Sequence, residues 1–264
     1  MVRYTFIRWV GGKQWLWKYI KPYLISDHHE IYIEPFLGGG AIAIHYLKWC
    51  KKHNVNKKFI LTDTNEALIN TYIKIRDDVD ELIERLETLC NTPIHEKLYY
   101  ACRDEFNKIS KDSVRSAALF IFLNGRSYGG IWRVNKYDHF NVSFDKTRTI
   151  DVFSADQLRD LRDLFQDVEF RCCAFNEVRE NGIIYLDPPY INVYQKYSLN
   201  PPTNQDLQRF IDDHPDSDVL ISNNMHYTPP TNATLLYTTA IPERLSSKFD
   251  ARRGEYLYRI PGKN

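Results

Sequence analysis

The chain has 264 residues, of which 43% are hydrophobic and 26% charged, and its formal net charge is +1. These values are typical of a globular protein and argue against a disordered chain. No apolar run approaches the roughly 20 residues of a membrane-spanning helix, and residues 1–6 lack the apolar core of a signal peptide. We therefore expect a cytoplasmic protein that does not bind a membrane.

The first part of the chain alternates short apolar strands with helices. We expect a strand over residues 31–33, a glycine-rich break over Glu34–Gly40, a helix over 41–48, a strand over 59–61 leading to Asp63, and a helix over 66–75. Strand, glycine loop, helix, strand and acidic residue, in this order, open a doubly wound nucleotide-binding sheet. The sequence therefore predicts an α/β fold.

The middle of the chain has a different character. Residues 79–109 and 113–123 have helical spacing, with a break around 91–93, and residues 124–148 are irregular. Between Arg115 and Arg148, six basic and two acidic residues lie among aromatic ones, which suits a polyanion with bases that stack. A solvated loop surface is the alternative, and composition alone does not decide between the two.

A second group of strands follows the middle segment. We expect a helix over 156–164, strands over 168–173 and 182–186, a short helix over 206–211 and a strand over 219–224. The strands of the sheet thus come from residues 31–65 and from 168 onward. We predict one α/β domain made of residues 1–78 and 150–264, with residues 79–149 inserted as a mainly helical subdomain.

Two segments at the start of the chain are candidates for holding a cofactor. In an open α/β sheet the ligand lies beyond the carboxyl ends of the strands, where Glu34–Gly40 stands, and Asp63 is suited to ribose hydroxyls. The loop is not G-x-G-x-x-G and lacks the Lys-Ser/Thr pair of a phosphate-binding loop. An adenosine cofactor without pyrophosphate therefore fits better than a dinucleotide, which disfavours a nicotinamide oxidoreductase.

The N-terminal run Arg8–Lys13 is a further candidate. Trp9 is able to pack on an adenine or a methionine group, and Lys13 is able to pair with the carboxylate of a cofactor's amino-acid end. A Trp9 that simply belongs to the core is the plainer interpretation. The five cysteines are scattered and form no C-x-x-C pair, so we expect no disulfide framework and no bound metal.

The sharpest signal is Asp187-Pro188-Pro189-Tyr190, directly after the apolar strand. An exocyclic amine on a base is a weak nucleophile, and two acceptors aimed at its hydrogens stabilise the positive charge that develops on methyl transfer. The Asp187 carboxylate and the Pro188 carbonyl supply such acceptors, Pro189 stiffens the backbone, and Tyr190 offers a ring for stacking. A base within a duplex must be extruded to reach this site. A proline turn after a strand is the structural alternative.

Together these segments resemble the Dam-type DNA adenine-N6 methyltransferases (D12 class, group alpha). The resemblance rests on Arg8–Lys13, Glu34–Ala41, Asp63 with Asn65, and Asp187–Tyr190, in the order of that class. It implies a Rossmann-like methyltransferase sheet, S-adenosylmethionine (SAM) as cofactor and double-stranded DNA as partner. The cofactor-binding residues that it implies are Trp9, Gly12, Lys13, Glu34, Pro35, Phe36, Gly38, Gly40, Asp63, Asn65 and Asp187.

The middle segment resembles the same class, in Glu105-Phe106-Asn107, Phe122-Leu123-Asn124 and Phe140-Asn141-Val142 among others. By that resemblance a hairpin enters the DNA, Tyr128 inserts at the flipped base, and Arg133 reads a base edge, for which arginine suits guanine. The expected DNA-binding residues are Asn124, Arg126, Tyr128, Arg133, Asn135 and Lys136. Gly125, Arg126 and Gly129 differ from the usual residues of the class, so the usual GATC site is one option among others.

Two departures from the class concern the end of the chain. The stretch between Tyr190 and Val219 is short, which predicts a reduced lid over the base, and only Arg252–Leu257 resembles the basic tail. Methylation of cytosine N4 or of an RNA base stays an alternative, as does a catalytically silent DNA-binding relative. We expect a monomer or weak dimer in the cytoplasm of a bacterium or of the host cell of a virus.

Overall fold

The computed structural model describes residues 5–91, 94–147, 151–189, 201–224, 226–239 and 254–263. Its α-helices are α1 (Trp17–Ile25), α2 (Ala41–His53), α3 (Glu66–Asp77), α4 (Val79–Cys90), α5 (Glu96–Phe106), α6 (Val114–Arg126), α7 (Ala155–Phe165) and α8 (Asn204–Asp212). Its strands are β1 (Ile31–Glu34), β2 (Lys58–Asp63), β3 (Val168–Cys172), β4 (Ile183–Leu186), β5 (Asp218–Asn223), β6 (Thr234–Thr238) and β7 (Tyr256–Ile260).

In the described part of the chain, seven strands form one sheet in the order β3-β2-β1-β4-β5-β7-β6. The strands from β3 to β5 are parallel, and β7 is antiparallel to both β5 and β6. From β1 the chain winds outward through β2 and β3, and later outward on the other side through β4 and β5. This doubly wound, Rossmann-like order confirms the α/β fold predicted from the sequence.

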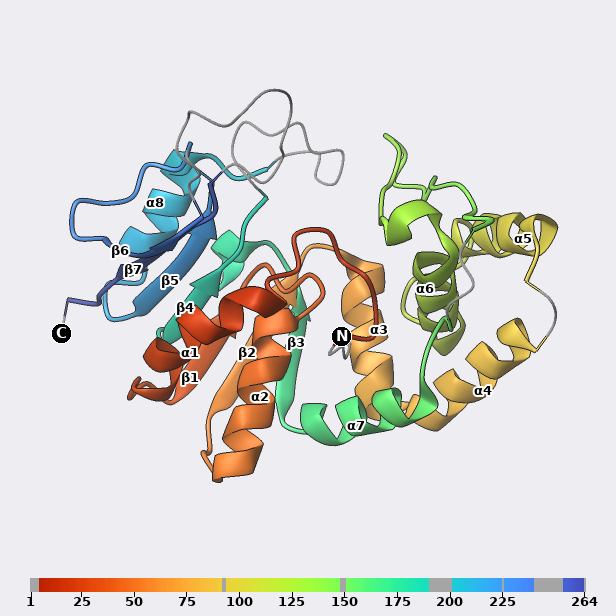
Figure 1. Ribbon diagram of the computed structural model, residues 1–264, viewed down its shortest axis with the longest axis horizontal. Helices are drawn as coiled ribbons and strands as arrows, with labels where there is room; N and C mark the ends of the chain where they lie inside the picture. The colour runs from red at the N-terminus through yellow and green to blue at the C-terminus, as the bar shows by residue number, and fades with distance from the viewer. Residues whose placement is uncertain are drawn as a thin grey trace.

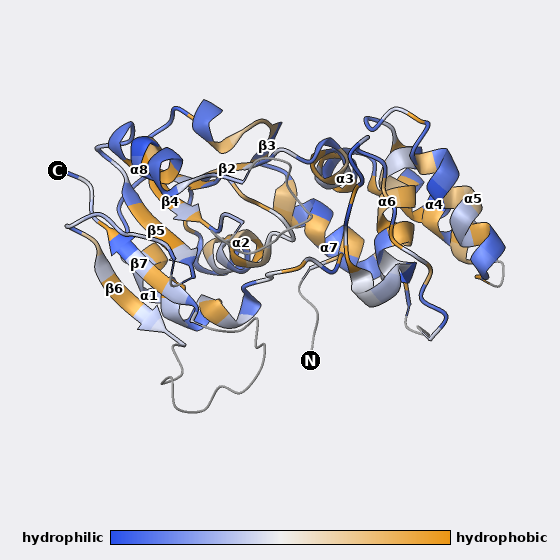
Figure 2. Cartoon of the chain, turned by 90° about the horizontal axis from the view of Figure 1, so that it is seen from above, coloured by the Kyte–Doolittle hydropathy of each residue, from blue (hydrophilic) through white to orange (hydrophobic). Residues whose placement is uncertain are grey.

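Helices cover both faces of the sheet, as the short apolar strands require. Neighbouring residues of β1 point to opposite faces: Tyr32 packs with Tyr46 of α2, whereas Ile33 belongs to a second apolar cluster with Phe210 of α8. In Figure 1, α1 and α2 lie in front of the strands, and Figure 2 shows the hydrophobic colour concentrated on the strands and the inner faces of the helices. The sheet is therefore buried on both sides.

The helical segment between β2 and β3 lies beside the sheet and continues its core. Helix α6 packs against α3, α4 and α5, and from Ala117 to Leu123 its residues are buried. Figure 1 shows α4, α5 and α6 grouped on the side of α3 away from the strands. The predicted helical insertion is thus observed, while its exact limits at 79 and 149 stay a prediction, because one apolar cluster runs through both parts.

Three elements were not foreseen from the sequence. Helix α1 contains Pro22, a residue that argues against a helix when the sequence alone is considered. The strands β6 and β7 lie in the C-terminal part of the chain, where the resemblance to the class is weak. All five cysteines carry free thiols, as expected. Among the described residues no helix is both long and apolar enough to cross a membrane.

Candidate active site

A pocket lies at the carboxyl edge of the sheet, where β1 and β4 are neighbours and the chain winds away in both directions. Ligands of doubly wound sheets bind at such a switch point. The cavity measures about 170 Å³, many times the roughly 10–15 Å³ that a single water molecule needs. It is lined by Thr5, Trp9, Val10, Gly11, Gly12, Lys13, Gln14, Glu34, Phe36, Leu37, Gly38, Gly39, Gly40, Ala41, Ile42, Tyr185 and Asp187.

The glycine loop is shaped by two aromatic side chains. A Cβ on Gly38 or Gly39 would lie 2.7 or 2.9 Å from atoms of the Trp9 side chain, and one on Gly40 would lie 2.6 Å from the Tyr72 hydroxyl. Gly38 and Gly40 also have φ values of 48° and 64°, which side chains disfavour. Trp9 is therefore both a packing partner of the loop, stacked toward Phe120, and a wall of the pocket.

Asp63 and Asn65 have structural partners instead of lining the cavity. The carboxylate of Asp63 accepts hydrogen bonds of 2.9 Å from the Gly38 and Asn65 backbones, and Asn65 caps α3 by accepting from Leu68. Burial raises the pKa of Asp63, and these hydrogen bonds oppose the rise. Asp63 thus fixes the glycine loop to the start of α3, and its predicted contact with ribose stays a prediction. Pro35 also lies outside the lining.

Glu34 ends β1 as a buried carboxyl group that faces the pocket. It is 2% exposed, and the Tyr32 hydroxyl donates to it at 2.6 Å. Burial raises the pKa of Glu34 to about 8; the Tyr32 hydrogen bond opposes this shift, and the Asp187 carboxylate adds to it. A carboxyl group that is hard to ionise in an empty pocket is well placed to receive a cationic ligand.

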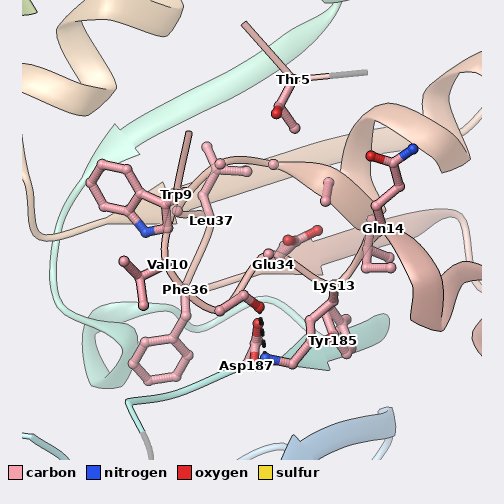
Figure 3. Close-up of a pocket in the computed structure, with 17 residues that line it drawn as sticks. Thr5, Trp9, Val10, Lys13, Gln14, Glu34, Phe36, Leu37, Tyr185 and Asp187 are labelled. Atoms are coloured by element: carbon pink, nitrogen blue, oxygen red, sulfur yellow. Dashed lines mark hydrogen bonds and ion pairs between the residues drawn. The ribbon is translucent and has the colours of Figure 1, made fainter. Parts of the chain in front are cut away.

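Lys13 joins the N-terminal arm to the end of β4. Its ammonium lies 3.0 Å from Asp187 Oδ1 and 3.6 Å from Glu255 Oε1, and it donates to the Gly11 carbonyl at 2.7 Å. Figure 3 shows Lys13 and Asp187 pointing toward each other across the pocket. The contact with Asp187 is the closer of the two ion pairs. A contact between Lys13 and a cofactor carboxylate, as the sequence predicted, stays a prediction.

Asp187 is also held from β5. The Ser222 hydroxyl donates to Asp187 Oδ1 at 2.9 Å, and Ser222 lies 2.9 Å from the buried Tyr185 hydroxyl. Pro188 is buried, and Pro189 is half-buried. Tyr190, the last residue of the predicted catalytic tetrapeptide, lies outside the described residues, and so does much of the expected lid. The described part of the tetrapeptide therefore stands at the pocket with its carboxylate fixed in orientation.

The segment after α6 forms the expected hairpin. Its two arms are joined by antiparallel bridges between Ser127 and Phe144 and between Val134 and Phe140. In Figure 1 the hairpin rises beyond the end of α6 on the same side of the molecule as the carboxyl edge of the sheet. Tyr128 and Tyr137 are 66% and 68% exposed. Two large aromatic side chains thus project from one hairpin.

The predicted DNA-binding residues divide into outward and inward side chains. Lys136 is exposed beside Tyr137, with 4.9 Å between its ammonium and the ring centre. Arg126 is half-buried, and so is Arg133, which donates to Asn141 Oδ1 at 2.8 Å. Asn135 is also half-buried and stabilises the tip, because its side chain accepts hydrogen bonds from the Tyr137 and His139 backbones.

Asn124 faces the interior and not the solvent. It is 1% exposed; its amide accepts from the Arg8 backbone and donates to the carbonyls of Arg8 and Gly130, at 2.9, 2.9 and 3.3 Å. This placement does not fit the direct DNA contact expected from the sequence, because the polar atoms of the side chain are engaged with backbone. Asn124 instead fastens the N-terminal arm to the base of the hairpin.

Several supporting residues were missed by sequence reasoning. Asn107 forms two hydrogen bonds with the backbone of Phe140, at 2.9 and 3.1 Å, and so holds the hairpin to the end of α5. Ser222 donates to Asp187, and Glu255 lies 3.6 Å from the ammonium of Lys13. Asn107 and Glu255 lie in stretches that resemble the class, so a signal was present for these two residues, but without contacts no role could be given to them.

A group with the composition of a metal site lies elsewhere. Ligand atoms of Asp27, His28 and His29 lie within 4.8 Å of one another. However, Asp27 already binds His29 at 2.6 Å and Lys57 at 2.8 Å, one through each carboxylate oxygen. The Lys57 ammonium takes the place that a cation would need, so this group has the contacts of a buried ion-pair cluster.

Comparison with known proteins agrees with this geometry. Residues 9–248 match the family described as D12 class N6 adenine-specific DNA methyltransferase. The chain is 34% identical over 229 residues to the type II methyltransferase M.MjaIII of Methanocaldococcus jannaschii, covering 78% of both chains. It is 33% identical to the DNA adenine methylase of Haemophilus influenzae and 30% identical to that of Escherichia coli K12, over 72% and 70% of this chain.

The chain spans just under two thirds, 65% and 64%, of the length of these last two relatives. The family match takes in the pocket lining except Thr5, the hairpin, and the strands from β1 to β6. It includes Glu34–Gly40, Asp187–Pro189 and Ser222, whereas Glu255 lies beyond its end. The chain belongs to the D12 class of N6 adenine-specific DNA methyltransferases.

Proposed function

We propose that this protein binds SAM in the pocket at the switch point and methylates N6 of an adenine that is extruded from a short duplex DNA site. The observation that carries the proposal is the position of Asp187. Its carboxylate lines the pocket and directly follows β4, next to the glycine loop. A donor in the pocket and an amine at Asp187 would therefore meet at one place, as methyl transfer between bound groups requires.

The chemistry of the pocket fits SAM. Trp9 and Phe36 offer apolar surface for the adenosine and methionine parts, the glycine loop lets a ligand approach the backbone closely, and Glu34 offers a carboxylate to a cationic group. SAM carries a positive sulfonium, which supplies the methyl group. Since binding a cation beside Glu34 favours the ionised carboxylate, the buried charge would gain a partner when the pocket fills.

The target amine needs acceptors, and Asp187 is held ready as one. Ser222 and Lys13 both contact Oδ1, and we assign Oδ2 as the acceptor for the N6 amino group. The Pro188 carbonyl is the second acceptor in this proposal. SAM, when bound, would supply the methyl group, with the electrons of the broken bond staying on its sulfur as N6 takes up the methyl carbon. The proton that the cationic N6 then has to lose would pass to the Asp187 carboxylate and from there to water, which gives N6-methyladenine.

The hairpin is the part that we propose enters the DNA. Tyr128 is exposed, and the hairpin that carries it rises on the side of the molecule where the carboxyl edge of the sheet lies. It is therefore suited to fill the space left by an extruded adenine. Lys136 is suited to phosphate and Arg133 to a base edge. Extrusion costs a few kcal/mol, which stacking of an aromatic side chain partly offsets. Such a protein would work in the cytoplasm, as a monomer or weak dimer.

The proposal is tested by methyl incorporation from labelled SAM into unmethylated duplex DNA, followed by sequencing that resolves modified bases. We expect N6-methyladenine at one short recurring site. Methylation of cytosine or of RNA alone would contradict the substrate, and a protein that binds SAM but transfers nothing would contradict the activity. Duplexes with a mismatched base opposite the target adenine should react faster if extrusion is part of the reaction.

A further inference from the structure

Glu255 lies at the active site because of the direction of β7. The last residue of β5, Asn223, pairs with Tyr256, the first residue of β7, since the two strands are antiparallel. The amino end of β7 therefore stands at the carboxyl edge of the sheet, beside the pocket. The backbone of Glu255 is fixed there by Thr239, which accepts from its amide at 2.9 Å and donates to its carbonyl at 2.9 Å.

Lys13 stands between two carboxylates at this edge. Its side chain is 5% exposed, and those of Asp187 and Glu255 are 20% and 14% exposed. Attraction between charges is several times stronger at such partly buried positions than in bulk water. The closer carboxylate is that of Asp187, at 3.0 Å against 3.6 Å for Glu255. The Lys13 ammonium thus lies between the two carboxylates and also donates to the Gly11 carbonyl.

This arrangement matters for Asp187 because the 3.0 Å contact of Lys13 is made at Oδ1, the oxygen that also accepts from Ser222. An ammonium with no second carboxylate nearby would be drawn further onto Asp187 and would compete for Oδ2, the oxygen that the target amine needs. It would also leave Asp187 a weaker acceptor, because a full positive charge would be balanced by that carboxylate alone. The Glu255 carboxylate pulls the ammonium toward β7 and so opposes both effects.

We propose that Glu255 is a positioning residue for methyl transfer: through Lys13 it keeps Asp187 Oδ2 open to the N6 amino group and keeps Asp187 a strong acceptor. The inference rests on the proposed function and adds to it a residue that touches neither SAM nor DNA. In this proposal the rate of methyl transfer depends on the negative charge of Glu255 and not on the size of its side chain.

Two substitutions separate charge from shape. Glu255→Gln keeps the shape and removes the charge, whereas Glu255→Asp keeps the charge and shortens the side chain. We expect the single-turnover rate of methyl transfer to fall about tenfold or more in Glu255→Gln and less in Glu255→Asp. The dissociation constants for SAM and for DNA should change by less than about threefold in both, since the effect arises in the transition state.

The matched control is Asp218→Asn. Asp218 also forms an ion pair with a residue of β7, at 3.0 Å from Arg259. It is the first residue of β5 and therefore lies at the opposite end of the strand from the pocket. This variant should transfer methyl groups at the wild-type rate. The inference is overturned if Glu255→Gln reacts as fast as the wild type or faster than Glu255→Asp, or if its loss of rate follows a loss of SAM binding.

The proposed function is judged separately by the wild type and by Asp187→Ala. If the wild type methylates adenine, Asp187→Ala does not, and Glu255→Gln is unimpaired, then the proposed function stands and the role of Glu255 is wrong. A wild-type protein that transfers no methyl group to any nucleic acid overturns both.

Discussion

The pocket and the hairpin both contain side chains whose burial is unusual for their type: charged groups are buried in the pocket, and aromatic groups are exposed on the hairpin. In the pocket, charged groups are buried: Lys13 is 5% and Glu34 2% exposed. On the hairpin, large aromatic side chains are exposed: Tyr128 is 66% and Tyr137 68% exposed. Charged residues are rarely buried unless they are paired, and exposed aromatic surface is typical of binding sites.

The two regions differ in where their partners are. The charges of the pocket are paired within the protein, Lys13 with Asp187 and Glu255, and Glu34 with Tyr32. The hairpin instead has a backbone fixed from inside, by Asn107 and Asn124, while the ring of Tyr128 projects into solvent. In our proposal, the pocket therefore receives a small cationic ligand between groups that are already paired, whereas the exposed side chains of the hairpin find their partners on the DNA.

The largest effect is expected at the pocket. Asp187→Ala removes the acceptor for the target amine and should lower methyl transfer by about a thousandfold, because such a preorganised group acts on charge as it develops. Binding of SAM and thermal unfolding should stay near the wild type, since Lys13 keeps Glu255 as a partner. Transfer rates and calorimetric SAM titrations check this. More than a tenth of wild-type activity would contradict the role of Asp187.

On the hairpin, Tyr128→Ala should lower methylation of a matched duplex by about 10- to 100-fold, because base extrusion loses the ring that fills the gap. A duplex with a mismatch opposite the target adenine should recover most of the rate, and SAM affinity should not change. Tyr137→Ala is the comparison variant, equally exposed on the same hairpin. An unchanged duplex rate together with weaker SAM binding would contradict the assignment of Tyr128.

A pair of glycine substitutions sharpens the comparison between the two regions. Gly38 and Gly129 have positive φ values of 48° and 65°, but a Cβ at Gly38 meets Trp9 at 2.7 Å, whereas one at Gly129 meets Ile131 only at 3.4 Å. Both alanine variants should lose about 1–2 kcal/mol of unfolding free energy from backbone strain. Only Gly38→Ala should lower SAM affinity, by about tenfold; a similar loss in Gly129→Ala would show that strain alone is responsible.

The smallest effect is a pH dependence of SAM binding. The pKa of Glu34 is raised to about 8 from an ordinary 4.5, so below pH 8 the empty pocket holds Glu34 mostly protonated. A cationic ligand favours the carboxylate, so SAM binding should release a proton and tighten by a few-fold as the pH rises from 7 to 8. Titrations in buffers of different ionisation enthalpy measure that proton. A pH-independent affinity in the wild type would contradict this.

The raised pKa of Glu34 also makes the stability of the folded protein depend on pH. Glu34 binds its proton more tightly in the folded, empty protein than in the unfolded chain, so it lowers the stability of the fold progressively from about pH 4.5 to about pH 8. Glu34→Gln lacks the titrating group and should show a flatter stability curve over this range, as well as losing the pH dependence of SAM affinity. Thermal unfolding at several pH values checks the first point.

The sheet and the site segments were predictable because short-range patterns encode them. The strands β1, β2, β4 and β5 appear in the sequence as apolar runs. Glu34 ends β1 and Asp187 directly follows β4, so strand direction alone predicts that they meet. The sequence pattern alone predicted only an irregular stretch after an apolar helix, and the hairpin was expected from the resemblance to the Dam-type class. These features depend on neighbours in the chain.

The rest depends on contacts between distant segments. Glu255 reaches the pocket only because β7 inserts antiparallel beside β5, an arrangement that no local pattern specifies. Asn124 and Asn135 have the residue type of DNA contacts, but burial and hydrogen bonding give them structural tasks. Asp63 likewise bonds to the glycine loop. A polar residue type shows what a side chain is able to bind, whereas its direction is decided by the fold.

The amide of Asn124 has a consequence for how the two substrates are brought together. It bonds to Arg8 on one side and to Gly130 on the other, and one residue beyond Arg8 stands Trp9, against which the glycine loop is packed. The hairpin that we propose enters the DNA and the arm that lines the proposed SAM pocket are therefore joined through this side chain. A displacement at the base of the hairpin would then reach the wall of the pocket through Asn124, Arg8 and Trp9.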